Sequence, residues 1–128
     1  MRLLLDTNIL LWALSEPKRL SAKAKAELEH RSNDILFSAA SIWELAIKAG
    51  KHKGVLPLDA QEVFAIALET GFQELAVTSA VARHVANLPP LHRDPFDRLL
   101  IAQAMAEPAV LLTSDAKLQP YSELVRLI

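Results

Sequence analysis

The sequence predicts an α/β domain in which helices cover both faces of a mainly parallel sheet of four or five strands. Three observations support this fold class. Short, wholly apolar runs at Leu3–Leu5 and Ala109–Thr113 are typical of strands buried on both faces. Helical patterns with good capping residues alternate with the predicted strands. The length of 128 residues suits one domain, which we expect to span residues 1–128.

The first half of the chain alternates strands and helices. Its predicted elements are a strand at Arg2–Asp6, a short helix at Asn8–Leu14, a charged amphipathic helix capped by Ser21 and reaching about His30, a strand at Ile35–Phe37, and a helix at Ser38–Ala49. Gly50 is placed to stop the last of these helices. The segment Lys51–Gly54 is predicted to be a basic loop.

The second half continues the same alternation. Its predicted elements are a helix from Asp59 to Thr70 stopped by Gly71, a strand at Glu74–Val77, a helix from Thr78 or Ser79 to about Ala86, a helix at Phe96–Ala106, a strand at Ala109–Thr113, and an edge strand at Val125–Ile128. The three prolines within Leu88–Pro95 exclude helix and central strand there, so this segment is predicted to be a stiff loop.

The composition excludes several classes of protein. Hydrophobic residues make up 52% of the chain, which leaves room for a buried self-association surface. Cysteine is absent, so disulfide frameworks and thiolate metal sites are excluded. The net charge of −1 provides no global basic field, and any nucleic-acid binding must use a local patch. No signal peptide or membrane span is predicted, so we expect a cytoplasmic protein.

Three aspartates are predicted to meet at one edge of the sheet. Asp6 and Asp115 each follow a buried strand, and parallel strands present their carboxyl ends on the same edge. Asp97 lies in the first turn of the helix that precedes the second of these strands. A helix that runs antiparallel to the strand after it begins at the carboxyl edge of that strand, so Asp97 is expected at this edge too. Two of these acids also have a simpler explanation, because Asp6 could cap the next helix and Asp97 could complement a helix dipole. Asp94 is best explained as such an N-cap.

Glu44 is a carboxylate within an otherwise apolar helix. Ser41 and Glu44 match a capping box, and Glu44 and Lys48 match an i,i+4 ion pair. The box is weakened because Ser38 is the better cap. A carboxylate among apolar side chains needs a partner, which either a metal ion or Lys48 could supply.

Convergence of these acids predicts a metal site. Carboxylates that share a crevice raise each other's pKa, so protons or a cation must offset their repulsion. Oxygen ligands without cysteine suit Mg²⁺ or Mn²⁺ better than zinc. We therefore predict that Asp6 binds metal, and that Thr7 or Asn8 caps the helix that follows.

Four segments together carry a family resemblance, namely Leu4–Asn8, Ser38–Lys48, His92–Ala104 and Leu111–Asp115. In this order and at this chain length, they make the sequence resemble the PIN-domain ribonucleases, and within them the VapC-type toxins of type II toxin–antitoxin systems. The resemblance covers nearly the whole chain. It implies a three-layer α/β/α sandwich and an Mg²⁺- or Mn²⁺-dependent endoribonuclease that hydrolyses RNA with a metal-activated water.

The resemblance also implies roles for particular residues. The acidic quartet would be Asp6, Glu44, Asp97 and Asp115, acting as catalytic residues and metal ligands. Supporting polar groups would come from Asn8 and from the hydroxyl of Thr113 or Ser114, while the role of Asp94 stays open. Members of the toxin group are usually homodimers neutralised by a small antitoxin, so both partners are expected here.

Cations and aromatic residues near these motifs have alternative interpretations. Candidates to hold the RNA backbone, or else ordinary surface charges, are Lys48, Lys51, Lys53, Arg93 and Arg98. His92 and His84 are interpreted as a loop residue and a helix-face residue rather than as bases. Trp43 and Trp12 are interpreted as core or dimer-interface residues rather than as platforms for stacked bases.

Two rival functions remain open from the sequence. An aspartyl-nucleophile phosphatase could use Asp6 after its apolar strand, although Asn8 stands where such enzymes usually carry a second aspartate. A non-catalytic α/β binding module could use the same acids only as helix caps.

Overall fold

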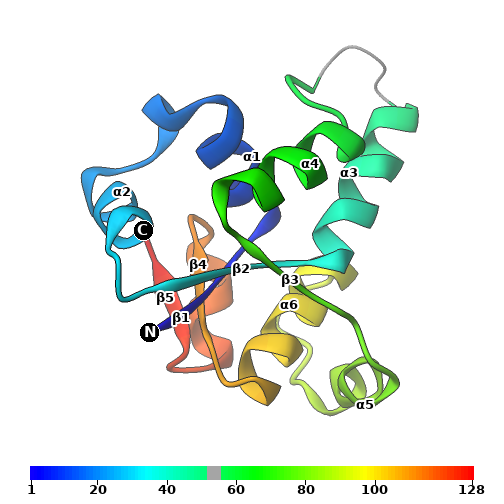
Figure 1. Cartoon of the computed structure of the whole chain (residues 1–128). Coiled ribbons are helices and arrows are strands. Elements are labelled where there is room, and N and C mark those ends of the chain that lie inside the picture. The colour runs from blue at the N-terminus through cyan, green and yellow to red at the C-terminus, as the bar shows by residue number, and fades with distance from the viewer. Residues whose placement is uncertain (52–55) are drawn as a thin grey trace.

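In the described part of the chain, the sheet has five strands, all parallel, in the spatial order β3-β2-β1-β4-β5 (Figure 1). The computed structural model describes residues 1–51 and 56–128, with Lys51 described in its backbone alone. The strands are β1 (Arg2–Leu5), β2 (Asp34–Ser38), β3 (Gln73–Leu75), β4 (Val110–Thr113) and β5 (Val125–Leu127). The sequence-based prediction of a mainly parallel sheet of four or five strands is therefore confirmed.

Helices cover both faces of this sheet, so the fold is a three-layer α/β/α sandwich (Figure 1). The helices are α1 (Thr7–Ser15), α2 (Ala22–Glu29), α3 (Ala39–Lys51), α4 (Ala60–Thr70), α5 (Ser79–His84) and α6 (Pro95–Ala106). The described residues also form 3-10 helices that the sequence did not predict, namely η1 (Pro17–Arg19), η2 (Val85–Asn87) and η3 (Ala116–Tyr121). None of the helices in the described part of the chain is long and apolar enough to cross a membrane.

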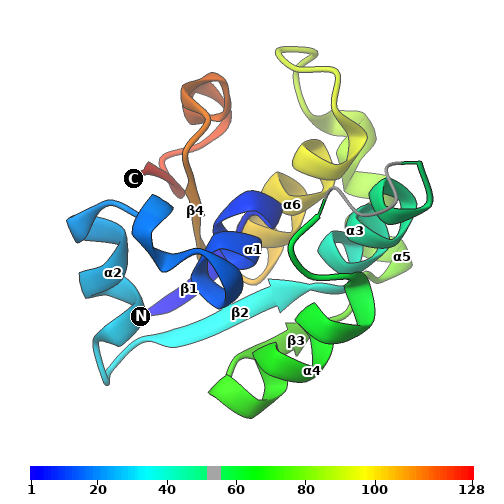
Figure 2. The ribbon, with the colours of Figure 1, turned by 90° about the horizontal axis from the view of Figure 1, so that it is seen from above.

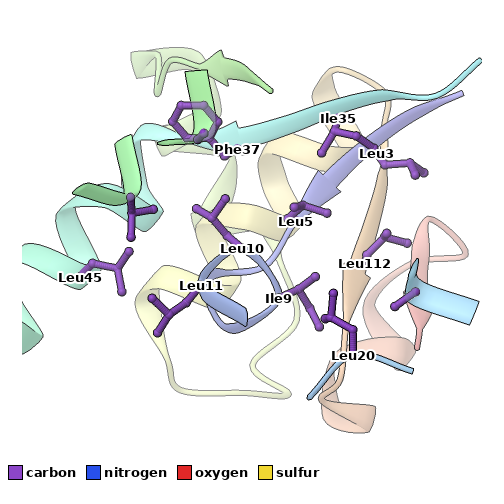
Figure 3. Close-up of a cluster of buried hydrophobic side chains, with 13 residues drawn as sticks. Leu3, Leu5, Ile9, Leu10, Leu11, Leu20, Ile35, Phe37, Leu45 and Leu112 are labelled. Atoms are coloured by element: carbon purple, nitrogen blue, oxygen red, sulfur yellow. The ribbon is translucent and has the colours of Figure 1, made fainter. Parts of the chain in front are cut away.

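Alternation along the central strand β1 builds two hydrophobic cores. Leu3 and Leu5 point to the side covered by α1 to α4, where they pack with Leu10 and Phe37 (Figure 3). Leu4 points to the opposite side, covered by α5, α6 and η3. All three leucines are fully buried, and each stabilises the fold by about 2 kcal/mol. The apolar run at the N-terminus thus contributes side chains to both cores.

The strand register brings Asp6 and the end of β4 side by side. Leu5 of β1 pairs with Leu112 of β4, and the Asp6 N–H donates to the Leu112 carbonyl at 3.0 Å. Figure 2 shows β2 pointing towards the start of α3, away from the N-terminus of the chain. The residues that follow β1, β2 and β4 consequently share one edge of the sheet, the carboxyl edge.

The two glycines predicted as helix stops differ. Gly71 ends α4 in the left-handed conformation, with φ of 97°, and the N–H of Phe72 donates to Ala67 behind it. The prediction for Gly50 is wrong, because α3 continues to Lys51 and Gly50 does not have a positive φ. A glycine ends a helix where the backbone turns left-handed, and its presence alone does not enforce that turn.

Candidate active site at the carboxyl edge of the sheet

Asp6 is buried and held by two protein donors. Its Oδ1 accepts from the Ile9 N–H at 2.8 Å, and its Oδ2 accepts from the Thr113 hydroxyl at 2.5 Å. The prediction that Thr7 or Asn8 would cap α1 is wrong, because Asp6 is itself the N-cap. Burial raises the pKa of Asp6 despite these two donors, and the nearby charges of Glu44 and Asp115 raise it further.

Glu44 is also buried, and its two oxygens contact different residues. The Thr7 hydroxyl donates to Oε1 at 2.7 Å, and Lys48 Nζ lies 2.8 Å from Oε2. The predicted i,i+4 ion pair is therefore present. The capping box is absent, because Ser38 accepts from the Ala40 N–H at the start of α3 and Ser41 lies inside the helix. The charge of Lys48 thus partly compensates the buried carboxylate of Glu44 in this apolar helix.

Asp97 lies in the first turn of α6 with a strongly perturbed pKa. Asp94 caps this helix and accepts from the N–H groups of Phe96 and Asp97, as predicted. Burial raises the pKa of Asp97 to about 6, and the charge of Asp94 is the next largest cause. Asp6 and Glu44 raise it as well, so the acids that the sequence predicted to converge influence one another electrostatically.

Asp115 and His92 complete the group. Asp115 caps η3 by accepting from the Lys117 N–H at 3.0 Å, and its own N–H donates to the Thr113 hydroxyl. His92 Nε2 lies 2.9 Å from Asp97 Oδ2. One ligand atom from each of His92, Asp97 and Asp115 lies within 4.8 Å of the other two, so these three side chains form a compact cluster.

His92 is the site residue that the sequence analysis missed. It lies in the loop before α6, as predicted, but its imidazole turns back onto the first turn of that helix. The available signal was its position five residues before Asp97 in a proline-rich segment. A stiff loop that leads straight into a helix N-terminus keeps its side chains close to the acids in that first turn.

The supporting polar groups are not equivalent. Thr113 is fully buried and donates to Asp6, and its supporting role in the site stays a prediction. Asn8 and Ser114 are exposed, and neither forms a side-chain hydrogen bond within the described part of the chain. Of these three predicted residues, Thr113 alone donates a side-chain hydrogen bond to a carboxylate of the quartet in the described part of the chain.

The candidate cations occupy four different situations. Lys48 is engaged by Glu44, and Arg93 is exposed in the loop beside His92. The Lys51 side chain and Lys53 lie outside the described residues. Arg98 is engaged within the protein, because its guanidinium donates to loop carbonyls and to the Tyr121 hydroxyl. These contacts give Arg98 a structural role, and its role in holding the RNA backbone stays a prediction.

The two tryptophans, which the sequence suggested to be core or dimer-interface residues, differ in burial, and only Trp12 packs against a hydrophobic core. Trp43 is 61% exposed and meets Phe96 edge-to-face, with 5.2 Å between ring centroids. This pair joins α3 to α6 beside Glu44 and Asp97. Trp12 is half-buried, with the Arg19 guanidinium 4.4 Å from its ring centroid. A core position is therefore wrong for Trp43, and its role as a dimer-interface residue stays a prediction.

The donor set fits a hard divalent cation. It consists of carboxylate oxygens with one imidazole, and the raised pKa of Asp6 and Asp97 means that the protein alone does not offset their charges. A cation placed among them would do so. The fold and the site thus define an α/β protein with an acid-lined carboxyl edge.

Comparisons with known proteins agree with this class. The family model described as PIN domain matches residues 3–124. Ribonuclease VapC22 of Mycobacterium tuberculosis is 32% identical over 126 residues, which cover 92% of this chain and 90% of that protein. The chain therefore belongs to the PIN-domain family, and within it to the VapC type.

Two solved structures share the fold. One is a chain of VapBC2 from Rickettsia felis bound to a DNA fragment from its promoter, with a TM-score of 0.73, 23% identity and coverage of 100% of this chain and 98% of that one. The other is a chain of FitAcB from Neisseria gonorrhoeae, with a TM-score of 0.59, 18% identity and coverage of 91% and 89%. Both likenesses support the sandwich architecture.

Proposed function

We propose that this protein is an Mg²⁺- or Mn²⁺-dependent endoribonuclease, the toxin of a toxin–antitoxin pair that acts in the cytoplasm. The observation that carries the proposal is the gathering of Asp6, Glu44, Asp97 and Asp115 at one edge of the sheet, where burial and mutual repulsion raise the pKa of Asp6 and Asp97. The 32% identity to a protein named as a ribonuclease supports the same reaction class.

Within this proposal, Asp6, Asp97 and Asp115 hold the cation directly or through water, and Glu44 binds it or orients the attacking water. When bound, the divalent ion supplies a water of lowered pKa and neutralises charge on the scissile phosphate. Hydrolysis by in-line attack would leave a 5′-phosphate and a 3′-hydroxyl.

The surrounding residues fix these carboxylates before any substrate arrives. Donation from Thr113 and from the Ile9 N–H leaves Asp6 little rotational freedom, and Thr7 holds Glu44 in the same way. A site whose carboxylates are already oriented avoids reorganisation during the reaction. Thr113 and Thr7 are therefore positioning residues in this proposal.

The RNA backbone would approach from the side of the described cations that remain exposed. Arg93 is the strongest candidate because it is exposed beside His92. Lys48 is a second candidate, because its side chain is 44% exposed even though it pairs with Glu44. Lys51 and Lys53 stay proposals from the sequence.

The proposed protein partners are a small antitoxin and a second copy of the chain. The fold match to a chain of a VapBC2 complex supports the antitoxin. The exposed indole of Trp43, beside Glu44, is an apolar surface that a second copy could cover.

Cleavage of labelled RNA by the purified chain, with and without Mn²⁺, tests the activity. We expect cleavage only with the metal, products that carry a 5′-phosphate, and loss of cleavage in Asp6→Asn and Asp97→Asn. Asp34→Asn is a matched control, because Asp34 is exposed at the other end of β2. Undiminished cleavage in both site variants would refute the assigned site.

Expression in host cells tests the toxin role separately. The wild-type chain expressed alone should arrest growth, whereas Glu44→Gln should not. Equal growth of both strains, at equal protein levels, would argue against a toxin while leaving the nuclease chemistry open.

The phosphatase alternative is disfavoured by the surroundings of Asp6. Both of its oxygens already accept hydrogen bonds, which lowers their nucleophilicity. The same preparation assayed on a phosphomonoester should release no phosphate. A calorimetric titration with Mn²⁺ addresses the non-catalytic alternative, because acids that only cap helices would take up no stoichiometric metal.

A further inference from the structure

His92 is held in place through its own backbone. Its carbonyl accepts from Arg98 Nη1 at 3.4 Å and from the Tyr121 hydroxyl at 3.5 Å. Arg98 and Tyr121 are themselves joined by a hydrogen bond of 3.1 Å. The loop residue that carries the imidazole is thereby tied both to α6 and to η3, the two elements that begin at the acids of the site.

Arg98 also fixes the chain leading to His92. Its guanidinium donates to the carbonyls of Val85, Leu88 and Pro89, and the side chain is half-buried beneath the loop. A planar guanidinium with five donors suits this task, because it can satisfy several carbonyls at fixed angles. The position of the imidazole is therefore set by the fold rather than by a freely moving loop.

The distances around His92 match those of neighbouring metal ligands. Two ligand atoms that lie about 2.1 Å from an ion and at right angles to each other are about 3 Å apart. His92 Nε2 and Asp97 Oδ2 are 2.9 Å apart. A carboxylate oxygen of Asp115 completes a group whose members all lie within 4.8 Å of one another.

Burial and charge favour the same interpretation. The side chains of His92 and Asp97 are 19% and 23% exposed, so a cation between them could keep water ligands and reach a substrate. Two carboxylates in this cluster contribute negative charge, and an imidazole, which binds metal ions in its neutral form, would add a donor without adding repulsion. A third carboxylate at this position would raise the repulsion among the acids instead.

We propose that His92 is a metal ligand, which binds one divalent ion together with Asp97 and Asp115. The nitrogen donor raises the affinity of the site for first-row transition ions, including Mn²⁺, relative to Mg²⁺, because Mg²⁺ prefers oxygen ligands. This inference rests on the proposed function for the presence of a divalent ion, and it adds to the acidic quartet a residue that the quartet does not contain.

Pulsed electron paramagnetic resonance of the Mn²⁺-loaded chain tests the ligand directly. We expect nitrogen modulation in the spin echo of the wild-type protein, and we expect ¹⁵N-histidine labelling to change it. His92→Gln should lose this modulation. His30→Gln, a control in the turn before β2 at the opposite edge of the sheet, should retain it.

Calorimetry on the same three proteins provides the second readout. Loss of the imidazole should weaken Mn²⁺ binding by at least about tenfold, since loss of even an outer partner commonly costs that much. Mg²⁺ binding should weaken less, so the ratio of the two affinities should fall in His92→Gln and stay constant in His30→Gln.

The outcomes separate this inference from the proposed function. Stoichiometric Mn²⁺ binding without nitrogen modulation, or modulation that persists in His92→Gln, would overturn the ligand role and leave the nuclease proposal intact. Absence of both Mn²⁺ binding and RNA cleavage in the wild type would instead overturn the proposed function. The isotope experiment needs no substitution, so the absence of any ¹⁵N-histidine effect would overturn the ligand role even where His92→Gln fails to fold.

Discussion

The candidate acidic site has two sides that differ in burial and in the number of protein donors that contact their carboxylates. On one side, Asp6 and Glu44 are 6% exposed each, and both oxygens of each carboxylate contact donors of the protein. On the other side, Asp97 is 23% exposed and meets one side-chain donor, His92. We call these the buried side (Asp6 and Glu44) and the open side (His92, Asp97 and Asp115).

This difference in burial and hydrogen bonding suggests that the two sides have different roles. Hydrogen-bond donors surround the carboxylates of the buried side and fix their orientation. The open side keeps carboxylate oxygens and a nitrogen close together and partly accessible. Burial raises the pKa of Asp6 and the pKa of Asp97. At Asp97, the charge of Asp94 is the next largest cause of the rise. We infer that the open side captures the cation first, and that Asp6 and Glu44 of the buried side then complete its surroundings and orient the attacking water.

The largest expected effect comes from the open side. Asp97→Asn should lower the rate of RNA cleavage on the order of 10³-fold, because it removes a ligand to an ion that supplies several kcal/mol of charge stabilisation. It should also remove most Mn²⁺ uptake in calorimetry. The variant should remain folded, since Asn fills nearly the same volume. Retained metal binding would transfer the capture role to the buried side.

A smaller effect is expected when the buried side loses a donor. Thr113→Val leaves Asp6 Oδ2 without its hydroxyl partner, and the free energy of unfolding should fall by about 1–3 kcal/mol. The pKa of Asp6 should rise further, because the Thr113 hydroxyl now lowers it. Urea denaturation of the metal-free chain measures the loss. Thr70→Val, an exposed position, should change stability by less than about 0.5 kcal/mol.

The raised pKa of Asp97 makes stability depend on pH in a defined direction. Its pKa is 3.8 in a model peptide and about 6 in the folded chain, so between these values the folded state holds a proton that the unfolded state has lost. The contribution of Asp97 to the free energy of unfolding therefore decreases as the pH rises from about 4 to 6, and the penalty is complete above that range.

The comparison of metal-free wild type with Asp97→Asn isolates this contribution. Denaturation at several pH values should show that the substitution stabilises the chain at pH 7, on the order of 1–2 kcal/mol, and not at pH 4. Mn²⁺ affinity of the wild type should weaken below pH 6, where protons compete for Asp97. A stability difference that does not vary with pH would contradict the pKa assignment.

The smallest expected effect concerns Asp94, which borders the open side. Asp94→Asn keeps a good N-cap for α6 but removes a negative charge, so the pKa of Asp97 should fall while stability changes little. Carboxyl NMR titration measures this shift. Asp59→Asn, the same substitution at the cap of α4, should leave the pKa of Asp97 unchanged. Equal shifts in both variants would contradict a local charge effect.

Much of this fold was predictable because its signals are local. The apolar run at Leu3–Leu5 specified the central strand, and Asp59 and Gly71 marked the two ends of α4. Such patterns act through neighbours along the chain. The Gly50 prediction failed where a local signal had no matching turn in the backbone, and Ala116–Tyr121 folded into a 3-10 helix that carried no clear pattern.

The acids of the site were predictable for a related reason. Parallel strands place their carboxyl ends on one edge, so Asp6 and Asp115 had to share it once the strands were assigned. Glu44 was identified because a carboxylate in an apolar helix needs a partner. These inferences required topology and charge balance, and they did not depend on detailed side-chain geometry.

The sequence by itself determined the layers, the edge and the acids, because periodicity, caps and strand ends are properties of short segments. Only the tertiary structure decided three contacts. Asp6 caps α1 and lies close enough to Glu44 for its pKa to be raised, Arg98 donates to carbonyls of the loop before α6, and the His92 imidazole contacts Asp97. These contacts join residues of different elements or fold a loop back on a helix. Their geometry depends on how the elements pack, which no single segment of the chain encodes.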